Sequence, residues 1–140
     1  FGAAEILGDT DSETLWKGVR DAAPLAAGER VIWRVSLAPT AAPAFLGAVR
    51  AALDVDYFLD WGGGLVWLAG PATEAAHQAV CQAASAQGGT WVLFRGPEPL
   101  RAAVAVIPPE PPPLARIARQ VKAAFDPRGI LNPGRMYAGL

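Results

Sequence analysis

The sequence contains one cysteine, one histidine and one methionine among its 140 residues. A single cysteine excludes a disulfide within the chain and is compatible with a reducing, cytosolic compartment. Metal sites need several histidine, cysteine or carboxylate ligands, whereas His77 and Cys81 supply two, one helical turn apart. We therefore expect no metal site, and we interpret these two residues as an ordinary pair on a helix surface.

Clusters of lysine and arginine are also lacking, and the apolar runs are short. The formal net charge is -1, whereas nucleic-acid-binding proteins carry a basic stripe, so we expect no nucleic-acid partner. The apolar run at residues 102–107 is far shorter than the about 20 residues that cross a bilayer, which predicts no transmembrane segment. Hydrophobic residues make up 52% and charged residues 18%, which is typical of a globular chain. The length suits one domain, residues 1–140.

Hydrophobic periodicity predicts the order strand, helix, strand, strand, helix, strand. The predicted strands span residues 31–37, 56–61, 65–69 and 90–94. The first has one apolar face and one mixed face, and Arg34 lies on the mixed face. The first helix begins near Thr40, an N-cap candidate, and Pro71 and Thr73 open the second.

This order is the pattern of two split β-α-β units, which defines the ferredoxin-like (βαββαβ) fold. We therefore predict an α+β fold, an antiparallel sheet with both helices on one face. The opposite face of the sheet must then be solvated or covered by something else.

Other segments flank this predicted core. A helix that carries Leu15, Trp16 and Val19 precedes it. Residues 102–107 are a candidate edge strand, and five prolines at residues 108–113 predict a stiff extended connector. An amphipathic C-terminal helix follows, and its apolar residues are Leu114, Ile117, Ala118, Val121 and Phe125.

The most informative segment is the tail at residues 125–135. The helix should end at Asp126, because Pro127 disfavours helical geometry there. Two glycines then allow a sharply shaped loop that presents Asn132 and Arg135. An asparagine amide suits the pyrimidine edge of a flavin, and an arginine favours a reduced, anionic flavin. A tail that merely folds back and packs explains the same spacing, so the residues alone leave both interpretations open.

This tail, with Lys122 before it, resembles the C-terminal signature of FAD-linked oxidases of the vanillyl-alcohol oxidase superfamily. Further stretches resemble one branch of that family, the FAD-binding subunits of bacterial glycolate oxidases. They are residues 33–37 (WRVSL), 59–63 (LDWGG) with 67–68 (WL), and 135–137 (RMY). Together the matches span nearly the whole chain in order.

The resemblance implies a two-part protein that binds FAD between two domains. An N-terminal domain, absent from this chain, holds the ADP and pyrophosphate groups, and the C-terminal part is a ferredoxin-like cap whose open sheet face covers the flavin. In the family, the loop that matches residues 130–134 approaches the flavin. The resemblance therefore assigns Asn132 and Arg135 as cofactor-binding residues.

Two arginines are candidate substrate-binding residues. Arg20 follows Leu15 and Trp16 in a pattern that resembles related 2-hydroxyacid dehydrogenases, where an arginine binds the substrate carboxylate. Here the arginine lies one residue later than in that pattern, and a solvated helix arginine is the alternative. Arg34 would face the flavin or substrate cavity, and a strand arginine paired with Asp60 is the alternative.

The resemblance implies an FAD-linked oxidoreductase subunit of a complex that oxidises glycolate, a small 2-hydroxy acid, to glyoxylate. Its implied partners are a second flavoprotein subunit and an iron-sulfur subunit, and its implied location is the cytoplasm or the periphery of the inner membrane. Catalytic residues are not evident, since no nucleophile, base and orienting group occur together.

Catalytic relatives use histidines and an acidic residue to bind a divalent metal, whereas this chain has a single histidine, His77. A second hypothesis is therefore a non-catalytic interaction module that docks a partner subunit through the open sheet face. We expect the 140 residues alone to be inactive, to retain no FAD, and to self-associate through exposed apolar surface.

Overall fold

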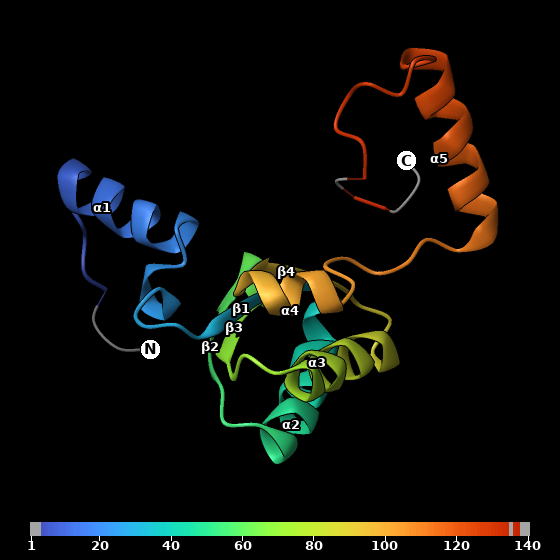
Figure 1. The fold of residues 1–140 in the computed structure, drawn as a ribbon. Coiled ribbons are helices and arrows are strands. Elements are labelled where there is room, and N and C mark those ends of the chain that lie inside the picture. Colours follow the sequence, from blue (N-terminus) through green and yellow to red (C-terminus); the bar gives the residue numbers. More distant parts are fainter. Residues whose placement is uncertain (1–3, 135, 138–140) are drawn as a thin grey trace.

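An antiparallel sheet of four strands forms the centre of the structure (Figure 1). The computed structural model describes residues 4–134, 136 and 137. The strands are β1 (Val31–Ser36), β2 (Asp56–Asp60), β3 (Leu65–Gly70) and β4 (Thr90–Arg95). Their order in the sheet is β2-β3-β1-β4, with every neighbouring pair antiparallel. This is the strand order of two split β-α-β units, so the predicted α+β, ferredoxin-like fold is confirmed.

Two helices, α2 (Ala42–Ala52) and α3 (Glu74–Ala86), cover one face of this sheet (Figure 1). Trp33 on β1 lies opposite Leu68 on β3 and Leu93 on β4, and all three side chains are buried beneath the helices. The alternation along β1 and β4 thus places one set of side chains in a dry core, as the sequence predicts, whereas β3 is buried on both faces.

The helix starts follow two different patterns. Thr73 caps α3, since its Oγ1 accepts the N–H of Ala76 at 3.1 Å. The prediction that Thr40 caps α2 is wrong. Residues Pro39–Ala41 form a 3-10 turn that leads directly into α2, and no side-chain cap is present there. Pro39 and Pro43, each in a first turn, supply fixed φ angles instead of a capping hydroxyl.

His77 lies inside the core, which corrects its interpretation as a helix-surface residue. The side chain is 4% exposed, and its Nδ1 accepts the indole N–H of Trp33 at 3.1 Å. A neutral ring with an accepting Nδ1 carries its proton on Nε2, which lies 3.3 Å from Cys81 Sγ. Burial lowers the pKa of His77 and raises the pKa of the half-buried Cys81 to about 12. The two residues are therefore a neutral polar pair within the packing of α3.

The expected edge strand at residues 102–107 does not form. Helix α4 (Glu98–Ala103) occupies its first residues, and one backbone hydrogen bond, from Leu93 N–H to Val106 C=O at 2.8 Å, joins the following segment to β4. Two prolines follow directly after Ile107 and lack the N–H groups that a ladder needs, so the pairing ends there.

Helices α1 (Asp9–Arg20) and α5 (Pro112–Phe125) stand away from the sheet at opposite sides of the molecule (Figure 1). Neither contains a buried residue. The predicted apolar stripe of α5 exists but is exposed, from Leu114 to Phe125, and Trp16 is exposed on α1. No helix in the described part of the chain combines the length and apolarity that crossing a membrane requires.

Candidate functional site

The loop after α5 is held by one carboxylate. The Asp126 side chain is 5% exposed, and its Oδ1 accepts the N–H of Ile130 at 3.1 Å. Its Oδ2 accepts the N–H of Leu131 at 2.9 Å and the ammonium of Lys122 at 2.7 Å. Lys122 also donates to the carbonyl of Leu131. We call Lys122, Asp126, Ile130 and Leu131 the tail clasp, because they tie the loop to the last turn of α5.

The tail clasp has a clear electrostatic signature. The pKa of Asp126 is lowered to about 2. The hydrogen bond from Lys122 is the largest cause, and the N–H groups of Leu131 and Ile130 lower the pKa further. The carboxylate is therefore ionised throughout the neutral range. Charge-assisted hydrogen bonds of this kind are stronger than neutral ones, so the loop conformation is well determined.

Asn132 follows the clasp with a positive φ of 46°. Asparagine tolerates this left-handed conformation better than most residues, because its short polar side chain makes local hydrogen bonds. The residue lines a cavity of about 510 Å³ between α5 and the tail, here called the tail cavity. The other residues that line it are Glu110, Ala118, Lys122, Leu131, Met136 and Tyr137.

Sequence reasoning missed Glu110 and Tyr137 as residues of this cavity. Glu110 Oε2 is shielded from solvent and has no hydrogen-bond partner within the described chain. Burial raises the pKa of Tyr137, and the charge of Glu110 raises it further, which indicates that the two groups are close. One feature of the sequence could have pointed to Glu110. It is the one charged residue among the prolines at residues 108–113.

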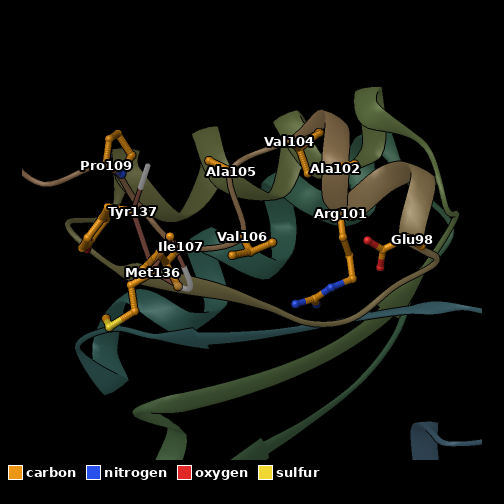
Figure 2. Close-up of a pocket in the computed structure, with 11 residues that line it drawn as sticks. Glu98, Arg101, Ala102, Val104, Ala105, Val106, Ile107, Pro109, Met136 and Tyr137 are labelled. Atoms are coloured by element: carbon orange, nitrogen blue, oxygen red, sulfur yellow. The ribbon is translucent and has the colours of Figure 1, made fainter. Parts of the chain in front are cut away.

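A second, larger cavity of about 740 Å³ lies on the other side of Met136 and Tyr137. Figure 2 shows these two tail residues beside Ile107 and Pro109, with Arg101 at the opposite end. Because Met136 and Tyr137 line both cavities, the tail separates the α4 connector from α5. The side chains of Met136 and Tyr137 therefore form the wall between the two cavities.

Arg34 lies on the sheet face opposite α2 and α3. Its guanidinium carbon is 5.8 Å from the ring centroid of Trp67, its cross-strand neighbour. Phe58 stacks on Trp67 at 6.0 Å and Phe94 meets it edge-on at 5.0 Å. The structure places Arg34 over this aromatic cluster, while Asp60 accepts the N–H of Trp61.

Arg20 ends α1, where it forms a two-pronged ion pair with Asp21 at 2.7 and 2.9 Å. Its side chain is 70% exposed, and the carboxylate of Asp21 raises its pKa. The guanidinium also lines a surface hollow with Trp16 and Lys17. A substrate carboxylate at Arg20 would therefore have to displace the carboxylate of the adjacent residue.

The structure does not bring the predicted site residues together. Asn132 lies in the tail cavity and Arg20 lies on α1. Arg34 lies on the sheet face opposite α2 and α3, which Ala22 and Leu25 partly cover through a second buried cluster that includes Trp67. None of the residues that line the tail cavity belongs to the sheet. Arg135 lies outside the described residues. Within those residues, no group of three or more histidine, cysteine or carboxylate side chains is placed to hold a metal ion.

Comparison with known proteins places this site in a family. Residues 110–136 match the family model described as FAD linked oxidases, C-terminal domain. The chain is also 33% identical over 144 residues to glycolate oxidase subunit GlcE of Escherichia coli (strain K12). These two matches support a C-terminal region of the GlcE type within the FAD-linked oxidase family. The match covers 99% of this chain and 35% of that relative, and no solved structure matches the chain.

The matched segment of this FAD-linked oxidase region coincides with the tail cavity. Every residue that lines the cavity lies within residues 110–136, apart from the adjacent Tyr137. The family signature therefore describes a folded unit, in which α5, the tail clasp and the cavity wall are built together. The predicted resemblance to the FAD-linked oxidases is confirmed.

The donor set of the cavity fits the edge of a flavin ring. Asn132 offers one amide donor and acceptor, and Glu110 offers an acceptor without a partner in the described chain. Leu131, Met136 and Ala118 add apolar wall. A planar ring with polar atoms on one edge and apolar faces needs this combination of side chains.

Proposed function

We propose that the parent protein is an FAD-dependent subunit of a glycolate oxidase complex, and that this chain is the C-terminal cap on its flavin. The observation that carries the proposal is the tail cavity, which is lined by the family-matched segment and presents Asn132. The chain spans 35% of the curated relative it matches, so the proposed nucleotide-binding domain belongs to the remainder of such a parent.

In this proposal the chain's residues bind and orient the cofactor. Asn132 contacts the pyrimidine edge of FAD, and the tail clasp fixes the direction of its side chain. Arg135 supplies positive charge near the same edge. The bound flavin would supply the redox chemistry by accepting a hydride from glycolate, which becomes glyoxylate.

Substrate recognition is proposed for the two other arginines. Arg34 has the better environment, because its guanidinium lies over Trp67 on a sheet face that α2 and α3 leave uncovered. A guanidinium binds a carboxylate through two parallel hydrogen bonds. Arg20 is already paired with Asp21, so it would contribute only if that pair opened.

The proposed partners are a second flavoprotein subunit and an iron-sulfur subunit, and the proposed location is the cytoplasm, at the periphery of the inner membrane through the complex. The exposed apolar stripe of α5 would pack against the remainder of the parent. On the isolated 140 residues the same stripe would drive self-association, and FAD would not be retained without the pyrophosphate site.

The decisive experiment is anaerobic titration of the purified full-length parent with glycolate. We expect a yellow protein whose flavin absorbance bleaches on addition of glycolate and recovers when an electron acceptor is added. A matched sample treated with acetate, which lacks the hydroxyl group, should stay yellow. A colourless, cofactor-free parent would contradict the proposed FAD site, and a yellow parent that glycolate does not bleach would contradict the proposed substrate.

A further inference from the structure

Glu110 is the least explained polar group of the tail cavity. Its Oε2 atom is closed off from solvent and accepts no hydrogen bond from any described residue. A buried carboxylate oxygen without a donor is costly, and native proteins almost always pair such atoms. The position therefore calls for a donor from outside the described residues.

The described donors on the cavity wall do not pair with Glu110 Oε2. Lys122 lines the cavity, but its ammonium donates to Asp126 and to the carbonyl of Leu131. Tyr137 lies close enough for the charge of Glu110 to raise the pKa of its phenol, yet no hydrogen bond joins the two. Glu110 Oε2 is therefore an acceptor on the cavity wall that no described residue uses.

The backbone holds this acceptor in place. Glu110 lies between Pro109 and Pro111, and proline fixes φ near -65° and stiffens the chain on both sides. Asn132, which lines the same cavity, is held by the tail clasp that directly precedes it. Two polar side chains from segments more than twenty residues apart are therefore both presented to one cavity by rigid supports.

We propose that Glu110 accepts the ring N–H of the flavin pyrimidine, beside the carbonyl that the Asn132 amide contacts. This inference rests on the proposed function and deepens it. The pyrimidine edge of a flavin is an imide, in which one N–H lies between two carbonyl groups. The carboxylate of Glu110 would accept that N–H, and the side-chain amide of Asn132 would donate to the neighbouring carbonyl. Together the two residues would bind an imide edge in preference to an edge that has no N–H donor.

The test compares FAD with an FAD analogue methylated at the pyrimidine nitrogen, which lacks the N–H. Both are titrated against the apo form of the full-length parent, with flavin fluorescence as the readout. The wild type should bind FAD about tenfold or more tightly than the methylated analogue, because a hydrogen bond to a charged acceptor is lost. In Glu110→Ala this preference should fall to near one. Arg128→Ala, an exposed change in the same tail, should keep the wild-type preference.

A Glu110→Ala protein that prefers FAD as strongly as the wild type would overturn the inference. If that variant binds neither flavin, Glu110→Gln decides, because its amide oxygen remains a weaker acceptor. A preference below the wild-type value in Glu110→Gln supports the inference, and an unchanged preference overturns it. Tyr137→Phe should leave the preference unchanged, and a loss there would assign the acceptor role to Tyr137 instead. A wild-type parent that binds no FAD would contradict the proposed function itself, which is a distinguishable result.

Discussion

Lys122 and Asp126 lie one turn apart at the end of α5, with the ammonium 2.7 Å from the carboxylate. The pair does more than stabilise the helix end, since Asp126 also accepts the N–H groups of Ile130 and Leu131. A single side chain thus joins the last turn of the helix to the loop that presents Asn132. The geometry of the proposed flavin contact depends on this pair.

Asp126→Asn should weaken FAD binding in the full-length parent by about tenfold, because the charge-assisted bonds of the tail clasp are lost and the loop is no longer fixed. Fluorescence titration of the apo protein measures the effect. Asp54→Asn is the matched control, since that side chain is fully exposed and remote from the tail. Equal affinities for both variants and the wild type would show that the clasp does not position the loop.

Protonation of His77 should make the fold less stable in acid. Burial lowers its pKa, so below about pH 6.5 the unfolded chain binds a proton that the folded chain resists. The free energy of unfolding should therefore be largest above that pH and should fall between pH 7 and about pH 5. Cys81 stays neutral in this range, because its pKa is about 12.

Urea denaturation at several pH values measures this dependence, and His77 is the sole histidine of the chain. His77→Phe removes the titrating group and should flatten the curve between pH 7 and 5. A wild type whose stability is constant across that interval would contradict a buried neutral histidine.

Arg34→Met should raise the KM for the hydroxy acid about tenfold or more in the full-length parent, with a smaller change in kcat. Methionine keeps apolar contact with Trp67 but cannot bind a carboxylate. Arg50→Met is a close control, because Arg50 also lies over an aromatic ring, that of Tyr57, but on α2. An unchanged KM for Arg34→Met would remove Arg34 from the substrate site.

Sequence periodicity was enough to predict the sheet, because alternation such as that of Trp33 and Arg34 reports directly on which face is buried. It failed for His77, since periodicity cannot show that Trp33 supplies a hydrogen bond that pays for burying an imidazole. It also failed at residues 102–107, where α4 and the following prolines outweigh the apolar composition.

The candidate site was predicted in part. The position of Asn132 in a shaped loop followed from the helix-ending Pro127 and from the glycines, and the structure confirms such a loop. The other residues that line the cavity were not predictable from the sequence. Glu110 precedes α5 along the chain, and Tyr137 follows the loop after α5. Contacts between segments so distant in sequence depend on tertiary packing and leave no local pattern.

The most direct test of the account is the FAD dissociation constant of Asn132→Ala in the full-length parent, compared with the wild type and with Arg128→Ala. Loss of one hydrogen bond, worth about 0.5–1.5 kcal/mol, should weaken FAD binding about two- to twelvefold in Asn132→Ala, with Arg128→Ala unchanged. Identical dissociation constants for all three proteins would contradict the claim that the tail after α5 presents Asn132 to the flavin.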